Sequence, residues 1–234
     1  MAVVAGIDGC PAGWLCLTKH LSTGAVQARI LTSIGALLDL SHRPQVVMVD
    51  MPIGLPDAGP RACDIAARAE LLRPRASSVF RAPVRPMLAA TTYARACRLG
   101  MAADGCKLSK QTWFILPKIR ELDAFLREDP KRHGWVREVH PEVSFRAWAG
   151  GRAMAHPKRK AAGRAEREAL VEPVYGAAYA ALQASLPRSD YANDDLLDAF
   201  AALWTGERVA RGRDRVLPGT PPVDAFGLRM EIVV

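Results

Sequence analysis

The fold is decided by the stretch Val3-Val4-Ala5-Gly6-Ile7-Asp8-Gly9-Cys10-Pro11-Ala12-Gly13-Trp14. It begins with an apolar, partly β-branched run, which predicts a short buried strand, and its glycines and proline predict a tight turn into a second strand. Asp8 stands where the first strand ends. An ionised carboxylate is costly to bury unless a cation, a ligand or water compensates it. This stretch therefore supports two interpretations equally: Asp8 caps the turn through its own backbone, or it belongs to a functional site.

Two more strands and a helix are predicted after this turn. Residues 13–20 and 25–31 have the composition of strands and are separated by a Ser-Thr-Gly turn. Ser33 is a suitable N-cap for a helix over residues 34–41, where apolar residues recur at helical spacing. The chain is therefore predicted to begin with an antiparallel meander of three strands followed by a helix.

The run Val46-Val47-Met48-Val49-Asp50 repeats the opening pattern, because an apolar strand again ends in an aspartate. The preceding helix is a natural crossover that lets this fourth strand lie parallel to the first. Three antiparallel strands, a crossover helix and two further strands are the element order of the ribonuclease H-like fold. We therefore predict an α/β fold with such a mixed sheet, flanked by helices, in which Asp8 and Asp50 end neighbouring strands.

A mostly helical insertion is predicted at about residues 57–134, before a fifth strand over residues 135–139. We expect the insertion to pack as a cap on a single ribonuclease H-like domain that spans residues 1–234. The stretches with helical periodicity are residues 57–72, 91–102 and 109–128.

Further acidic residues follow the fifth strand and open the last predicted helix. Glu138, His140 and Glu142 lie within five positions and could act as ligands or as acid and base groups. A structural hydrogen-bonding role is equally supported for His140. Asp195 and Asp198 are three residues apart and so share one helical face, although acids at a helix start also stabilise the helix dipole.

The fold order would gather aspartates from three separate elements at one end of the sheet. Several carboxylates in one cleft cannot all remain ionised without cations. Oxygen ligands without a cysteine or histidine cluster are typical of Mg²⁺ or Mn²⁺. Two such ions about 4 Å apart can activate water and stabilise the leaving oxygen when a phosphodiester is hydrolysed. The predicted metal ligands are Asp8, Asp50, Asp195 and Asp198.

Basic and hydroxyl side chains provide candidate contacts for a phosphate backbone. Residues 73–86 form an irregular loop rich in arginine and proline. The helix over residues 109–128 begins with amides that suit an anion, and residues 152–168 are a basic stretch. The alternative is an ordinary solvated surface. The candidate phosphate-binding residues are Arg75, Ser77, Ser78, Arg81, Arg85, Lys110, Gln111 and Lys158.

The composition limits which class of protein this is and which kinds of partner it can have. The 234 residues carry a net charge of +8, which favours a polyanionic partner such as nucleic acid, although an arginine-rich proteome would produce the same excess. Five cysteines without CxxC spacing argue against a zinc site or disulfides. The sequence shows neither a transmembrane run nor a secretion signal. We expect a cytoplasmic protein without a membrane partner, and the oligomeric state stays open, with a homodimer as one option.

Six motifs, in this order, resemble those of one bacterial and archaeal family. They are GIDGCPAGW, VDMPIGLP, RACDIAAR with the following ASSVFRAPVRP, SKQTW, EVHPEVSF and DDLLDAFAALW. The family is that of the predicted ribonuclease H-like nucleases, long labelled as a domain of unknown function. The core also resembles the Holliday-junction resolvases, whose four acids match the four aspartates named above. The departure is Asp50, because resolvases have glutamate at that position.

The resemblance and the acids together imply a metal-dependent nuclease with Mg²⁺ or Mn²⁺ as cofactor. Glu138 or Glu142 would be a further ligand or would orient water, and His140 would assist proton transfer. Two alternatives remain. The chain could be an ATP-using enzyme of the actin and sugar-kinase branch of the same fold, in which the hairpin after Asp8 cradles phosphate. It could also be a non-catalytic protein that binds nucleic acid or a small ligand.

Overall fold

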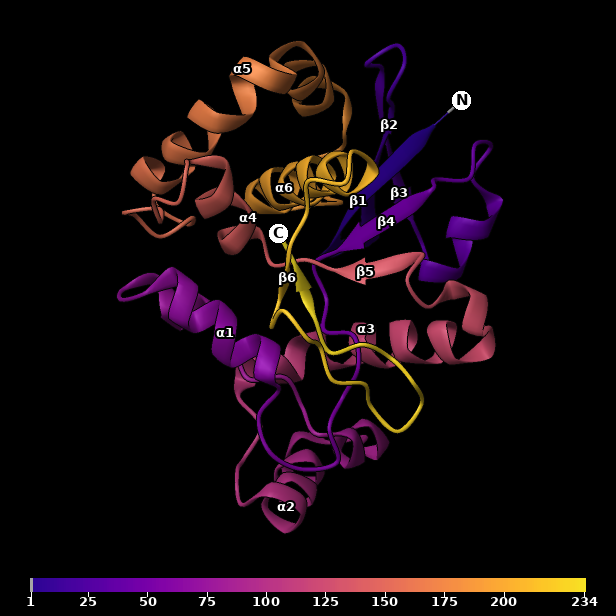
Figure 1. The fold of residues 1–234 in the computed structure, drawn as a ribbon, viewed down its shortest axis with the longest axis vertical. Helices are drawn as coiled ribbons and strands as arrows, with labels where there is room; N and C mark the ends of the chain where they lie inside the picture. The colour runs from indigo at the N-terminus through magenta and orange to yellow at the C-terminus, as the bar shows by residue number, and fades with distance from the viewer. Residues whose placement is uncertain (1) are drawn as a thin grey trace.

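A five-stranded mixed sheet forms the centre of the computed structural model, which describes residues 2–234 (Figure 1). The strands lie in the order β3-β2-β1-β4-β5; β1 is antiparallel to β2 and β2 to β3, whereas β4 is parallel to both β1 and β5. This arrangement confirms the predicted ribonuclease H-like sheet. The strand bounds are β1 Val3–Cys10, β2 Gly13–His20, β3 Val26–Leu31, β4 Val46–Val49 and β5 Val136–Glu138.

The register of β1 and β4 brings Asp8 and Asp50 to the same sheet edge. Ile7 pairs with Val49, so each aspartate is the next residue on its own chain. The Asp50 amide donates to the Ile7 carbonyl at 2.9 Å, which continues the ladder one step beyond β4. The two carboxylates therefore leave the sheet side by side, as the repeated strand-then-Asp pattern predicts.

The alternation of side chains along each strand decides which face these acids share. Val4 and Met48 belong to the apolar core that contains α6 (Asn193–Ala210), whereas Ile7 and Val49 belong to the core that contains α3 (Lys110–Glu128). Since side chains alternate with a period of two, Asp8 and Asp50 fall on the α6 side.

Helix α6 lies unusually close to β1. A Cβ atom on Gly6 would stand 2.2 Å from the Leu203 amide nitrogen, so only glycine allows this approach. Helix α5 (Ala161–Ser185) arches over α6, and α4 (Pro141–Trp148) packs beside it (Figure 1). The sheet edge that carries the aspartates is thus covered by the start of α6.

The crossover between β3 and β4 differs from the prediction. It is a 3-10 helix, η1 (Ile34–Asp39), and not an α-helix over residues 34–41. A turn of three residues places Ile34 and Leu37 on one face, and both are buried, whereas Leu38 is exposed. Ser33 makes no side-chain cap; instead the Ile34 amide donates to Glu121 of α3 at 2.6 Å.

The chain between β4 and β5 is mostly helical, as predicted, with some shifted boundaries. The first helix begins at Ala62 and not at residue 57, because Gly59 has a positive φ of 80° and Pro60 disfavours helix in the residue before it. The last helix of this segment, α3, continues through Pro117. The remaining elements there are α1 Ala62–Leu71, η2 Arg75–Ser78, η3 Arg85–Ala89, α2 Tyr93–Asp104 and η4 Pro130–Arg132.

The C-terminal segment forms a small second sheet. Strands β6 (Val216–Leu217) and β7 (Ile232–Val233) pair in antiparallel orientation. Val139, just after β5, makes an isolated bridge to Val233, so this segment covers the β5 edge of the main sheet. Within residues 2–234, none of the helices combines the length and the apolar character that a membrane crossing requires.

Candidate metal centre

Three buried or half-buried carboxylates meet at the edge of the sheet. One ligand oxygen each from Asp8, Asp50 and Asp198 lies within 4.8 Å of the other two. Asp50 directly follows β4, and Asp198 comes from the second turn of α6, which the close approach at Gly6 brings onto the strands. Asp8 does not end its strand as predicted: β1 continues for two more residues, because Gly9 and Cys10 still pair with β2. The structure therefore brings together three of the four aspartates that the sequence predicts as metal ligands.

The fourth, Asp195, has a different partner. Its carboxylate accepts a hydrogen bond from the Ala192 amide at 2.8 Å and so caps the N-terminus of α6. Burial, opposed by this hydrogen bond, raises the pKa of Asp195 to about 6. It lies close enough to raise the pKa of Asp8, but it is not one of the three mutually adjacent ligands. Its predicted role as a metal ligand stays a prediction.

The electrostatics of the three acids are unfavourable without a compensating cation. Burial first, and then the charges of Asp50 and Asp198, raise the pKa of Asp8 well above its ordinary value. Burial and Asp198 do the same to the pKa of Asp50. Like charges in a desolvated site resist joint ionisation, so a cation is needed to keep all three acids charged near neutral pH.

Lys158 supplies part of that compensation. Its ammonium pairs with Oδ2 of Asp198 and lies 3.3 Å from Oδ2 of Asp194. Burial lowers the pKa of Lys158, but the carboxylates of Asp198, Asp8 and Asp194 outweigh this effect and hold the pKa well above its usual value. Lys158 is therefore charged at neutral pH.

The donor set fits a divalent cation. Asp198 is 1% exposed, and its Oδ1 atom is buried without a hydrogen-bond partner among residues 2–234. A buried carboxylate oxygen without a partner is costly, and a metal ion would satisfy it. All three donors are hard carboxylate oxygens, which are the ligands that Mg²⁺ and Mn²⁺ prefer.

Glu138 is held by an arginine that sequence reasoning did not select. Arg61 donates to both Glu138 oxygens, at 2.6 and 2.7 Å, and the Ile53 amide donates to Oε2 at 2.7 Å. Arg61 also pairs with Asp64 at 2.5 Å. Burial, opposed by Arg61, raises the pKa of Glu138 to about 7. Because both of its oxygens are occupied, Glu138 positions the loop after Asp50. In the sequence, the only signal for the role of Arg61 is the Arg-x-x-Asp spacing within RACDIAAR.

The other two members of the predicted acid–base group lie at the start of α4, where Glu142 is buried and His140 is half-buried. Glu142 pairs with Arg167, but its Oε2 atom has no partner among the described residues. His140 precedes the first turn of α4, and its Nδ1 atom is likewise unpartnered there. Burial lowers the pKa of His140, so the imidazole is neutral at physiological pH.

Most of the predicted phosphate-binding residues are engaged locally. Ser77 and Ser78 donate to the carbonyls of Pro74 and Arg75, at 2.8 and 2.7 Å. Two arginines form ion pairs: Arg81 with Asp104, and Arg85 with Asp123 at 3.0 Å and with Asp224. The Lys110 ammonium lies 3.7 Å from the centre of the Tyr93 ring. Arg75 is half-buried and Gln111 is exposed.

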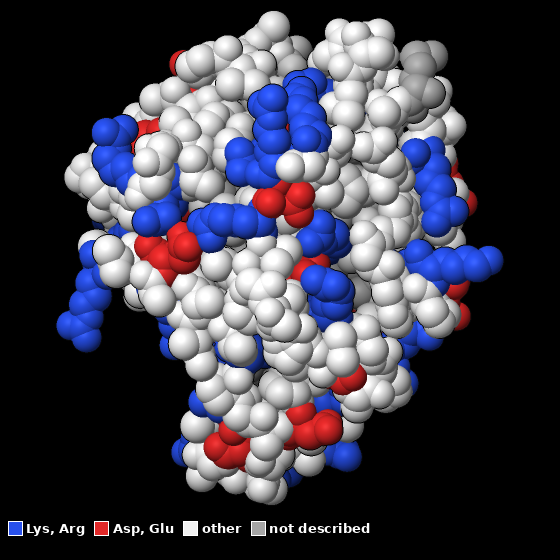
Figure 2. All heavy atoms as spheres, viewed as in Figure 1, with Lys and Arg blue, Asp and Glu red and all other residues white. Residues whose placement is uncertain are grey.

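Of these candidates, Lys158 is the one that forms an ion pair with a member of the acid cluster, Asp198, in the described part of the chain. Basic side chains elsewhere stand in several separate groups, with acidic side chains beside most of them (Figure 2). The net positive charge is therefore spread over this face and does not form one continuous strip.

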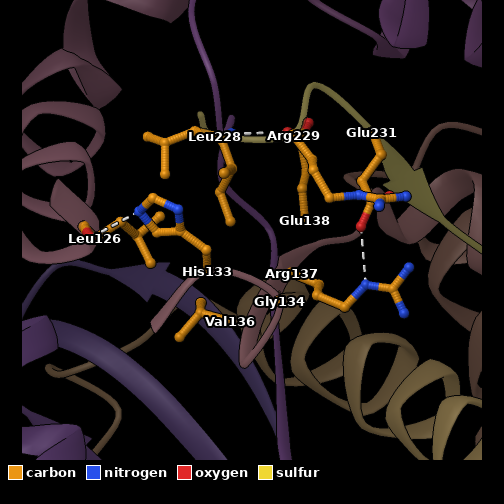
Figure 3. Close-up of a pocket in the computed structure, with 10 residues that line it drawn as sticks. Leu126, His133, Gly134, Val136, Arg137, Glu138, Leu228, Arg229 and Glu231 are labelled. Atoms are coloured by element: carbon orange, nitrogen blue, oxygen red, sulfur yellow. Dashed lines mark hydrogen bonds and ion pairs between the residues drawn. The ribbon is translucent and has the colours of Figure 1, made fainter. Parts of the chain in front are cut away.

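Two hollows lie outside the acid cluster. A cavity of about 20 Å³ between β5 and the C-terminal segment is lined by Glu138, Arg137, Glu231 and His133, among others (Figure 3). This volume is enough for about one or two water molecules and too small for a substrate. A polar groove of about 680 Å³ lies between α5 and the start of α6, with Arg164, Arg188 and Tyr191 among its lining residues.

Comparison with known proteins supplies a family and no activity. Neither the curated proteins nor the solved structures include a significant match to the chain. A family model described as "Protein of unknown function (DUF429)" matches residues 6–223, which include residues 6–10 of β1, the whole of β4, the three clustered aspartates and Lys158. Because this match covers most of the 234 residues, the chain belongs to that family of proteins of unknown function.

Proposed function

We propose that the protein is a metal-dependent nuclease that hydrolyses phosphodiester bonds in nucleic acid. One observation carries the proposal: the carboxylates of Asp8, Asp50 and Asp198 converge within 4.8 Å, and Asp198 keeps a buried oxygen without a partner among residues 2–234. A buried carboxylate oxygen without a partner is uncommon in a folded protein, and a bound ion is one explanation for it. The site is therefore best explained as a cation site.

The chain's own residues would divide the work as follows. Asp8, Asp50 and Asp198 would hold Mg²⁺ or Mn²⁺ at the sheet edge. A divalent ion supplies Lewis acidity that activates water and stabilises negative charge on a phosphate oxygen. Glu138, held by Arg61, would keep the loop after Asp50 in place. His140 is neutral at physiological pH and would be able to accept a proton.

Nucleic acid is the substrate class that the charge of the chain favours. The net charge of +8 promotes association with a polyanion. The six motifs that resemble ribonuclease H-like nucleases support the same reaction class, and the convergence of Asp8, Asp50 and Asp198 is compatible with it.

The ATP-using alternative has less support in the hairpin that would cradle phosphate. The Gly9 amide donates to Oδ1 of Asp8 at 2.7 Å, and the Ala12 amide donates to the Asp190 carbonyl at 3.2 Å. These two amides are therefore already bonded within the protein and do not point to a phosphate.

Asp8→Asn tests the proposed activity. Asparagine keeps an oxygen for the Gly9 amide but removes the charge, so the fold should persist while metal-dependent cleavage of labelled DNA and RNA oligonucleotides falls by about 100-fold or more. The matched control is Asp39→Asn, an exposed acid on η1. Wild-type protein that cleaves none of single-stranded, duplex or branched substrates with Mg²⁺ or Mn²⁺ would refute the nuclease proposal, and so would full activity of Asp8→Asn.

A further inference from the structure

The ammonium group of Lys158 occupies a position beside the acid cluster that a metal ion could otherwise take. Its ammonium contacts Asp198 and Asp194, and its charge acts on Asp8 and Asp50 as well. A lysine at the rim of a carboxylate cluster would be expected to contact one acid and extend into water. Lys158 instead contacts two acids of α6, Asp194 and Asp198, although its side chain is still 35% exposed. Its charge also acts on Asp8 of β1 and on Asp50, which follows β4.

The segment that carries Lys158 is fastened to α5. Glu166 accepts the amides of Ala155 and His156, at 3.1 and 2.9 Å, and Arg167 donates to the His156 carbonyl at 3.3 Å. A Cβ atom on Gly163 would stand 2.1 Å from the Pro157 carbonyl oxygen, so the segment rests directly on the first turn of α5. These contacts hold the backbone on both sides of Pro157, and a fixed loop therefore positions Lys158 beside the cluster.

The charges of the buried site balance with one divalent ion. Asp8, Asp50 and Asp198 carry three negative charges when ionised, and Lys158 carries one positive charge. The remainder equals the charge of a single Mg²⁺ or Mn²⁺. Asp194 is a quarter exposed and Asp195 caps α6, so water and the helix terminus compensate these two acids. A second divalent ion would leave the buried site with an excess of positive charge.

We propose that Lys158 is a built-in cation that takes the place of a second metal ion, so that the site binds one divalent ion per chain. The Asp198 carboxylate is then shared: Oδ2 bonds Lys158, and the unpartnered Oδ1 is left for the metal. This inference rests on the proposed function in requiring a metal at the three aspartates. It replaces the two-ion arrangement expected from the gathered aspartates with one ion and one ammonium.

The test counts ions and does not depend on activity. Titration of the metal-free protein with Mn²⁺, followed by calorimetry and by the electron paramagnetic resonance of free Mn²⁺, should give one ion per wild-type chain. Lys158→Met is shorter by one atom and otherwise keeps the unbranched shape of the side chain but removes the charge, and it should bind two ions. Lys160→Met is the matched control, because Lys160 is exposed two residues further on, and it should still bind one.

The outcomes separate this inference from the proposed function. Two ions bound to the wild-type chain would refute the role of Lys158 while leaving the metal site intact, as would a single ion bound to Lys158→Met. No Mn²⁺ bound by the wild type, with Asp8→Asn indistinguishable from it, would overturn both proposals. Lys158→Gln, which can still hydrogen-bond Asp198, serves as the second neutral variant if Lys158→Met does not fold, and it should also bind two ions.

Discussion

Replacing Arg61 with methionine removes the centre of a buried ion network. Arg61 is 3% exposed and makes its shortest bonds to Glu138 and Asp64, with a further bond to the Ile53 carbonyl at 3.1 Å. Methionine fills much of the same volume but leaves two buried carboxylates without their cation. Breaking a buried pair in this way costs about 3–5 kcal/mol of unfolding free energy. For a chain of this size, that corresponds to a fall in Tm of about 6–20 °C.

The pH dependence of this loss identifies its cause. The pKa of Glu138 is raised to about 7 even with Arg61 present, so without Arg61 the carboxyl will hold its proton to still higher pH. At pH 5 the folded variant has neutral Glu138, so one of the two unpaired charges is absent. At pH 8 the unfolded chain gains free energy by ionising Glu138, whereas the folded variant cannot do so without cost. The destabilisation should therefore be larger at pH 8 than at pH 5.

Urea denaturation followed by circular dichroism at both pH values measures the effect. Adding Glu138→Gln to Arg61→Met should recover part of the loss at pH 8, because it removes the carboxyl group whose ionisation favours the unfolded chain. Arg73→Met is the control, since Arg73 is exposed just after α1, and such surface changes stay within about 0.5 kcal/mol. A loss below about 1 kcal/mol at pH 8, or an equal loss at both pH values, would show that the buried pair does not hold the loop as described.

Two further predictions concern the acid cluster and the helix that completes it. The folded-state pKa values of Asp8, Asp50 and Asp198 are raised, chiefly by burial, so the metal-free protein holds protons that the unfolded chain releases. Its unfolding free energy should consequently fall as the pH rises above the ordinary aspartate pKa of 3.8 towards neutrality. Adding Mn²⁺ should reverse this fall. Urea titrations that show no fall in the unfolding free energy would contradict the electrostatic description. Gly6→Ala should destabilise the protein by about 3 kcal/mol or more, because its Cβ would stand 2.2 Å from the Leu203 amide, whereas Gly219→Ala meets nothing within 4 Å; equal melting temperatures for the two variants would refute the close packing of α6 on β1.

The sequence by itself determined the sheet and the first half of the site. Apolar runs that end in aspartate at 8 and 50 specify two buried strands. The predicted crossover before the second of these strands lets it lie parallel to the first. The two carboxylates must then share an edge, and the alternation of side chains places them on one face. Asp198 was also predictable, because an acid on the small, apolar face of a helix points inward.

Only the tertiary structure decided which partner each charged side chain takes. Local periodicity reports whether a position is buried, but an ion pair joins side chains that are far apart in the chain, such as Arg61 with Glu138 or Lys158 with Asp198. Glu138 therefore resembles a free ligand in the sequence and is a paired residue in the fold. Asp195, three residues from Asp198, is turned to the Ala192 amide, because the start of α6 needs a cap. The crossover became a 3-10 helix because the two apolar side chains it must bury are three residues apart.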